Sequence, residues 1–239
     1  MGADCIINIL KKRINNMMEQ SKDEKMTENQ PIQEQNEKPN EQGNLYVRGH
    51  IKIFDPETKE VFIDKANAIH YENFSLALAR SIANADTGWI SEMCFGNGGT
   101  RVDPTGIITY LTPNTVGLSA SLYNQTYIKN IDAKNPLDVD PARNFMDVRH
   151  ITGTAYTDVL VSCLLDFGEP TGQMAFDSAT NLNDTYVFDE LGLRGYGPNG
   201  PGTGDLLTHV IFHPVQKSLN RMLQIDYTVR IQALTNITG

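Results

Sequence analysis

The stretch Met222-Leu-Gln-Ile-Asp-Tyr-Thr-Val-Arg-Ile-Gln232 alternates apolar and polar residues almost without error. Its apolar face consists of Leu223, Ile225, Tyr227, Val229 and Ile231. Successive side chains of a β-strand point to opposite faces of the sheet, so this period of two predicts a strand with one buried face and one wet face. Such strands are typical of antiparallel sheets that pack face to face.

The same alternation recurs upstream, in residues 158–167. The apolar face of that segment consists of Val159, Val161, Cys163, Leu165 and Phe167. Burial of five such side chains contributes roughly 8–15 kcal/mol before the cost of chain entropy, at ~1.5–3 kcal/mol for each side chain. We therefore expect the two alternating strands to supply faces that pack against each other.

Shorter strand-like runs and one helix complete the pattern. The strands are expected at residues 45–53, 60–64, 89–95, 106–111, 122–129, 186–193 and 205–215, with exposed loops at 135–144 and 194–204. The helix is expected from Asn73 to Asn84, with an inner face made of Phe74, Ala77, Leu78, Ser81 and Ile82. This set of elements predicts an all-β fold, a mainly antiparallel β-sandwich with one inserted helix.

The first 44 residues differ in kind from the rest. Residues 19–44 are rich in Gln, Asn, Glu, Lys and Pro, so they cannot bury enough apolar surface to offset the entropy of ordering. Apolar residues at helical spacing in residues 1–18 indicate a short amphipathic helix. Two interpretations stay open: an anchoring helix on a flexible tether, or a leader without structural duty, since Met26 is a second candidate start. The predicted organisation is a flexible extension, 1–44, followed by a β-sandwich domain, 45–239.

Bulk properties narrow the class of protein. A net charge of -9 and a pI near 5.0 argue against binding to nucleic acid or to an anionic membrane, because both need an excess of Lys and Arg. We expect neither a transmembrane helix nor a secretory signal, since no apolar run has the required length or flanks. Cys5, Cys94 and Cys163 are odd in number and widely spaced, so they are expected to be buried thiols.

Several motifs could carry chemistry, but each has a structural interpretation that we favour. Gly96-Asn-Gly-Gly99 lacks the Lys-Ser/Thr of a phosphate-binding loop, which predicts a tight turn. His209 and His213 share a strand face without a third metal ligand, which predicts a half-exposed pair. The carboxylate clusters lack the rest of a calcium loop and are expected in solvated turns; they are Asp138-Val-Asp140 and Asp189-Glu190.

The remaining candidates are a nucleophile and an aromatic platform. Ser162 and Cys163 lie in mid-strand, where core packing is expected in place of catalysis. Trp89 and the scattered tyrosines are expected to pack against strands, with carbohydrate stacking as the alternative. The sequence therefore predicts a protein that is not an enzyme, with no catalytic, cofactor-binding or metal-ligating residue and no cofactor.

The order of elements carries a resemblance to a known class. An opening hairpin precedes Ala66-Asn-Ala-Ile-His-Tyr-Glu-Asn-Phe-Ser-Leu-Ala-Leu-Ala79, and a strand ends in the turn Met93-Cys-Phe-Gly-Asn-Gly-Gly-Thr100. Glu190-Leu-Gly-Leu193, Phe212-His-Pro-Val-Gln-Lys217 and the last alternating strand close the pattern. Over about residues 45–233 the chain resembles tailed-bacteriophage virion structural proteins. The long loops near 133–144 and 194–204 look like additions to that pattern.

The resemblance implies a structural component of a phage particle, in the tail, baseplate or neck, that acts by protein–protein assembly. It also implies a homo-oligomer that contacts other virion proteins and is assembled in the host cytoplasm. We expect no nucleic-acid, membrane or small-molecule partner. Two alternatives come from other classes. One is a carbohydrate-binding module that recognises a cell-surface glycan through exposed Tyr and Asp residues, and the weaker one is a hydrolase with a site assembled across loops.

Overall fold

The computed structural model describes residues 43–131, 143–175 and 184–234. All of them belong to one unit, Gln42–Gly239. Apart from its last two residues, the predicted N-terminal extension lies outside the described residues, with its amphipathic helix and Cys5. So does the Asp138-Val-Asp140 cluster.

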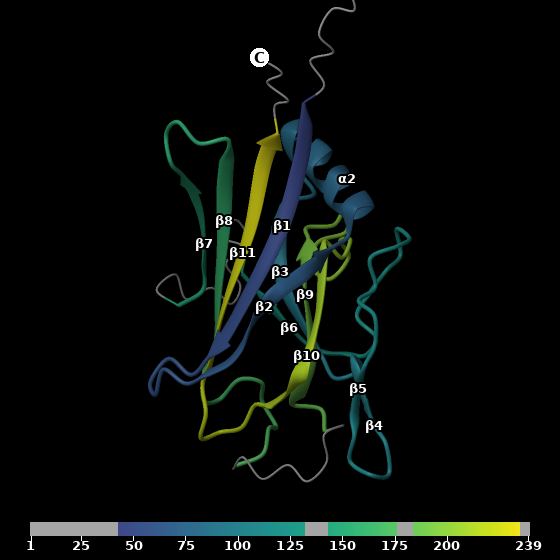
Figure 1. Ribbon diagram of the computed structural model, residues 1–239, viewed down its shortest axis with the longest axis vertical. Helices are drawn as coiled ribbons and strands as arrows, with labels where there is room; N and C mark the ends of the chain where they lie inside the picture. The colour runs from purple at the N-terminus through teal and green to yellow at the C-terminus, as the bar shows by residue number, and fades with distance from the viewer. Residues whose placement is uncertain (1–42, 132–142, 176–183, 235–239) are drawn as a thin grey trace, which may run out of the picture. The chain divides into compact units, whose positions relative to one another are not determined.

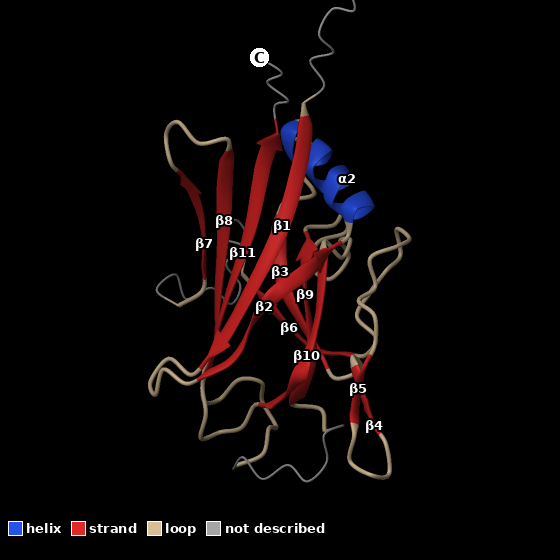
Figure 2. Cartoon of the chain, in the orientation of Figure 1, coloured by secondary structure: helices blue, strands red, loops and turns tan. Residues whose placement is uncertain are grey.

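The described residues form strands and one helix, which confirms the predicted all-β class with an inserted helix (Figures 1 and 2). In chain order the elements are β1 Asn44–Phe54, β2 Val61–Ile69, α2 Tyr71–Ile82, β3 Ile90–Gly96, β4 Thr100–Val102, β5 Ile108–Tyr110, β6 Gln125–Asn130, β7 Phe145–His150, β8 Tyr156–Leu165, β9 Val187–Gly195, β10 Thr208–Gln216 and β11 Leu223–Leu234. Most expected strands are present within a few residues of their predicted bounds.

Nine of the described strands form one curled antiparallel sheet in the order β6-β3-β9-β10-β2-β1-β11-β8-β7. Its two halves join through only two residue pairs, Thr208 with Ile69 and His209 with Ala68. We call this narrow junction between β2 and β10 the seam. The sheet curls so that the half β2-β1-β11-β8-β7 faces the half β10-β9-β3-β6, which gives the two packed layers of a sandwich (Figure 1).

The core lies between these halves, and the last strand is central to it. The inward residues Leu223, Ile225, Tyr227 and Val229 are buried, as the alternation predicts. They belong to one hydrophobic cluster with residues of the facing half, which include Met93, Phe95, Phe188, Leu191 and Leu193. Strand β11 pairs with β1 on one side and β8 on the other, so its inner face is fixed by two ladders.

The second alternating segment differs from prediction in its place and at its end. Strand β8 pairs with β11 in the same half of the sheet, so the two apolar faces lie side by side, and the prediction that they pack against each other is wrong. Strand β8 stops at Leu165, and Phe167 is 38% exposed instead of continuing the apolar face. The polar face is also more buried than expected, because β8 has a neighbour on each side. Ser162 donates a hydrogen bond to Asp226 at 2.8 Å, and the Leu164 N–H donates to the Asn144 amide oxygen at 2.9 Å.

The helix starts two residues earlier than predicted because His70 caps it, with its side chain accepting the Asn73 N–H. Asn73, Phe74 and Ala77 are buried, but Ile82 is 78% exposed, so its predicted place on the inner face is wrong. Ile82 lies eight residues beyond Phe74, which at 3.6 residues per turn rotates it by about 80° away from that side chain. The short strand β4 and the polar strand β7 were not expected.

The facing of β11 can be tested by a matched pair of substitutions. Ile225→Asp places an unpaired carboxylate at a position that is fully buried and should cost several kcal/mol of unfolding free energy. Thr228→Asp, on the outer face of the same strand, should cost about 1 kcal/mol or less, because only strand propensity changes. Denaturant unfolding of both variants measures the difference, and equal losses would contradict the assignment of faces.

Candidate interaction site

Residues 97–123 leave the sheet between β3 and β6, and we call this segment the arm. It carries the β4–β5 hairpin and a long loop, and it lies beside β10 (Figure 1). Its exposed apolar side chains are Val102, Ile107, Tyr110, Val116, Leu118 and Tyr123. They range from 37% exposed for Val102 to 89% for Val116. Apolar surface gathered on one projecting segment is a mark of an interaction site.

Both ends of the arm are held by one buried carboxylate, that of Glu190 on β9. Its Oε1 accepts the backbone N–H groups of Gly98, at 3.1 Å, and Asn124, at 2.7 Å. Its Oε2 accepts the N–H of Tyr123 at 2.9 Å. Since Gly98 starts the arm and Tyr123 ends it, Glu190 closes the arm at its base.

The neighbouring carboxylate, Asp189, holds the same end of the arm. It accepts the N–H groups of Gly99 and Thr100, each at 2.8 Å, and also the Thr100 hydroxyl. Asp189 and Glu190 are 1% and 0% exposed, so the prediction that they lie in a solvated turn is wrong. The backbone N–H groups of the arm replace water as donors, and only the folded chain brings them to these carboxylates.

The Gly96-Asn-Gly-Gly99 segment bends the chain between the end of β3 and the start of β4, and its glycines allow close packing. A Cβ on Gly96 would lie 2.5 Å from Glu190 Oε1, and a Cβ on Gly98 would lie 2.7 Å from the Asn124 nitrogen. Both distances are shorter than a real Cβ contact. The backbone donors of this segment therefore point at carboxylates of the protein, where a phosphate-binding loop would point them at a ligand.

His209 connects Glu190 to Asn114 of the arm. It is fully buried, so the predicted half-exposed histidine pair is wrong at this position. Its Nε2 lies 3.0 Å from Glu190 Oε2, and its Nδ1 accepts the N–H of Asn114 at 2.7 Å. The ring therefore bridges the carboxylate of Glu190 and the backbone of Asn114. Because β10 carries His209, the arm is tied to the sheet next to the seam.

Two further histidines contact the arm from different elements. His213 Nδ1 lies 3.2 Å from the hydroxyl of Tyr110, at the exposed end of the predicted pair. The buried His70 reaches the carbonyl oxygen of Gly117 through Nε2 at 2.9 Å. No sequence motif predicted a role for His70. Its position directly before the helix indicates a capping role, because a capping side chain is expected there.

Burial and hydrogen bonding move the two carboxylates in opposite directions. Burial raises the pKa of Asp189 above its usual value, despite hydrogen bonds from Thr100 and Gly99. Burial acts in the same direction on Glu190, but hydrogen bonds from His209, Asn124 and Tyr123 outweigh it and hold the pKa of Glu190 below its usual value. Glu190 is therefore an anion at neutral pH, as its set of four donors requires.

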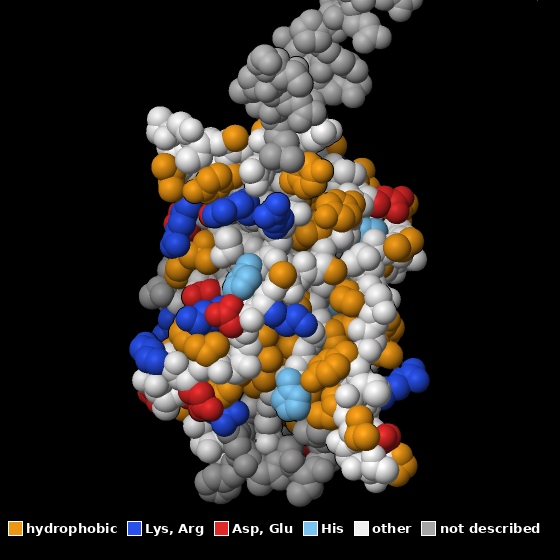
Figure 3. Space-filling view, viewed as in Figure 1, with side chains coloured by type: hydrophobic (Ala, Val, Ile, Leu, Met, Phe, Trp, Pro, Cys, Tyr) orange, Lys and Arg blue, Asp and Glu red, His pale blue; other side chains and the backbone are white. Residues whose placement is uncertain are grey.

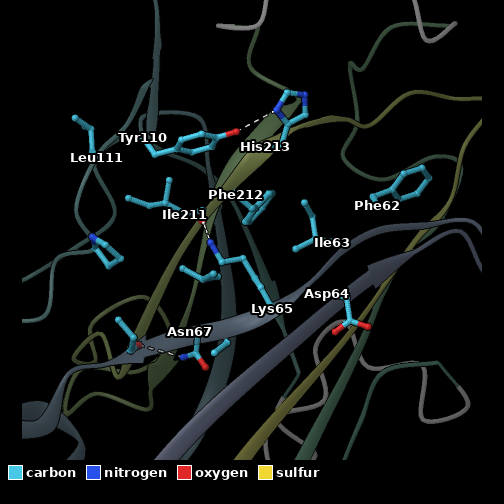
Figure 4. Close-up of a pocket in the computed structure, with 14 residues that line it drawn as sticks. Phe62, Ile63, Asp64, Lys65, Asn67, Tyr110, Leu111, Ile211, Phe212 and His213 are labelled. Atoms are coloured by element: carbon cyan, nitrogen blue, oxygen red, sulfur yellow. Dashed lines mark hydrogen bonds between the residues drawn. The ribbon is translucent and has the colours of Figure 1, made fainter. Parts of the chain in front are cut away.

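A cleft of about 440 Å³ lies between the arm and β2 (Figure 4). Tyr110 and Leu111 line it from the arm, and Phe62 and Ile63 line it from β2. Across the opening beside the seam, Lys65 Nζ donates a hydrogen bond to the carbonyl oxygen of Ile211 at 2.8 Å. The mixture of apolar walls and backbone edges in this cleft suits a side chain or a short peptide segment.

The other sequence candidates lie apart from the arm or inside the core. Burial raises the pKa of both Cys94 and Cys163 to about 12, so these thiols stay protonated at neutral pH. Trp89 stacks on Tyr196 with ring centroids 4.6 Å apart, as expected for packing. Among the described residues, no group of three or more His, Cys, Asp or Glu could hold a metal ion. No helix within the described ranges is long and apolar enough to cross a membrane.

Comparisons of the chain with family models, with curated proteins and with solved structures gave no match. The arm itself is therefore the feature that indicates a function. Its apolar side chains and the hydrogen-bonded frame beneath it are suited to binding another macromolecule.

Glu190→Gln tests the frame beneath the arm. The amide cannot accept from all four donors and adds donors of its own, so the variant should lose on the order of 3 kcal/mol of unfolding free energy at pH 7. The lowered pKa of Glu190 means that its contribution is present above the usual value of about 4.3 and is lost as the pH falls through the lower value of the folded state. The gap between wild type and variant should therefore shrink in acid.

Urea unfolding between pH 3 and pH 8 measures this gap. Glu57→Gln is the control, because Glu57 is exposed in the turn between β1 and β2. If the two substitutions cost the same at pH 7, Glu190 does not hold the arm.

Proposed function

We propose that the protein is a structural component of a bacteriophage particle, in the tail, baseplate or neck, and that it acts by protein–protein assembly through the arm. One observation carries the assembly part of this proposal. The arm displays six exposed apolar side chains while its backbone is fixed by Asp189, Glu190 and His209.

The energetic cost of this arrangement favours a binding role. Two carboxylates and an imidazole are withdrawn from water to hold a segment whose own apolar side chains stay exposed. A loop without a binding role needs no such frame. A segment that is already ordered binds with a smaller loss of conformational entropy, which is the benefit of preorganisation. The arm therefore has the properties of an interface element that is built before its partner arrives.

The surface beside the arm supports the same proposal. Hydrophobic side chains gather on the right of the view in Figure 3, where the arm and β10 lie, and charged side chains of both signs gather over β1, β8 and β11. An interface with an apolar centre and a polar surround fits this distribution. The proposed assignment to a phage particle, and to its tail, baseplate or neck, comes from the resemblance of residues 45–233 to virion structural proteins. We propose no enzymatic activity.

Exposed aromatic rings favour a second candidate, a carbohydrate-binding module that recognises a cell-surface glycan. Tyr71, Tyr110 and Tyr123 are 66%, 53% and 43% exposed. The hydroxyls of Tyr110 and Tyr123 are engaged by His213 and by the Thr112 carbonyl, which fixes the rings. Fixed aromatic faces are what sugar rings stack on. Assembly remains the leading proposal because the exposed side chains of the arm also include the aliphatic Ile107 and Val116, which sugars do not need.

The double substitution Val116→Asp and Leu118→Asp tests the assembly role. Both side chains are exposed, so the melting temperature should change by no more than a few degrees. Incorporation into particles should fall by about tenfold or more, since two carboxylates in an apolar contact lose at least the ~1.4 kcal/mol that this factor represents. The measurement is the amount of variant in purified particles relative to wild type.

Ile82→Asp is the matched control, because Ile82 is 78% exposed on α2, outside the arm. Normal incorporation of the arm variant would overturn the proposal. If Tyr110→Ala then abolished binding to a glycan array without affecting incorporation, the carbohydrate-binding candidate would replace it.

A further inference from the structure

Strand β7 ends the sheet in the part of the chain that the structure describes. Phe145–His150 pairs with β8 along its whole length, and the other side of β7 has no described neighbour (Figure 1). An edge of this kind offers unpaired N–H and C=O groups to another strand. Proteins usually protect such edges with charged side chains, above all Lys, with Pro or with a bulge. β7 contains no Pro or Lys and its register with β8 has no shift, and its charged side chains, Asp147 and Arg149, have opposite signs.

The sequence around this edge is complementary to itself. When two copies of Phe145-Met-Asp-Val-Arg-His150 run antiparallel with Val148 opposite Val148, Asp147 of each copy faces Arg149 of the other. In the same register, Phe145 faces Ile151 and Met146 faces His150. Opposite charges and β-branched or aromatic residues that face each other across strands stabilise a pair, whereas like charges destabilise it.

We propose that β7 is a dimerisation edge, at which a second copy of this chain adds its own β7 across a two-fold axis at Val148. The inference rests on the proposed assembly function and names one of its partners. Charge complementarity selects this occupant, because a two-fold axis converts the Asp147/Arg149 pattern into two cross-strand ion pairs. An isologous contact of this type closes on itself.

The side chains needed for this contact are accessible. Val148 is 67% exposed and Ile151 is 61% exposed, although both are apolar. The Arg149 and Asp147 side chains are 59% and 50% exposed and bind each other, at 2.9 Å between Nε and Oδ2. In the dimer the Asp147–Arg149 pairs of the two copies would lie together on the outer face of a sheet that continues from one copy into the other. Six residues make a small interface, so the isolated dimer is weak and gains strength from neighbouring contacts in an assembly.

Disulfide cross-linking of the full-length chain tests the register. In Val148→Cys the two introduced residues face each other, within the Cα separation of about 4.4–6.8 Å that a disulfide allows. In His150→Cys, on the same face, the two cysteines lie four positions apart along the strands, roughly 13 Å, which is too far. Mild oxidation should give a covalent dimer of the first variant at least about fivefold faster than of the second. Equal rates would overturn the proposal.

Charge reversal in the Val148→Cys background gives the second test. Asp147→Arg places like charges opposite each other in a homodimer, as does Arg149→Asp, so each should slow cross-linking by roughly fivefold. A mixture of the two variants should recover the wild-type rate as a heterodimer. Such recovery cannot come from altered folding of either chain. No recovery in the mixture would overturn the proposed pairing.

The two proposals fail separately. If the cross-linking rates are equal but Val116→Asp with Leu118→Asp still blocks incorporation, the arm assembles the protein and β7 does not. If cross-linking follows the predicted register but the arm substitutions have no effect on incorporation, β7 dimerises the protein and the role of the arm is wrong.

Discussion

The carboxylate of Glu190 is the interaction on which the outer part of the structure depends. It lies on a strand of the sheet but accepts three of its four hydrogen bonds from backbone N–H groups outside the sheet, those of Gly98, Tyr123 and Asn124. Because both ends of the arm bind the carboxylate of Glu190, the 27 residues from Asn97 to Tyr123 form a loop that is closed at its base. His209 extends this control to Asn114, about two-thirds of the way along the arm.

This arrangement explains why polar residues occupy positions that would otherwise belong to the core. A buried carboxylate without donors would cost more than a small domain can tolerate, whereas one with four donors is stable and specific in geometry. Asp189 and Glu190 therefore define a single position for the arm. A hydrophobic contact would hold the arm less specifically, because such contacts have no direction.

The sequence predicts the layers of this fold better than the arm. Ile225 and Val161 are buried as expected, because alternation along a long strand depends only on local geometry and burial. The predictions for Glu190 and His209 are wrong, because the backbone N–H groups that these side chains bind are more than 60 residues distant and no local pattern reveals them. Strand β7 was missed for a related reason: an edge strand with Asp and Arg on its outer face looks like a loop until its neighbour is known.

The seam and the arm are connected through one residue. His209 belongs to one of the two residue pairs that join the halves of the sheet, and the same residue binds both Glu190 and Asn114. The backbone of His209 therefore joins the two halves of the sheet, while its side chain holds the arm. Opening of the seam at this pair would displace the residue that positions Asn114. The seam and the arm thus share one residue.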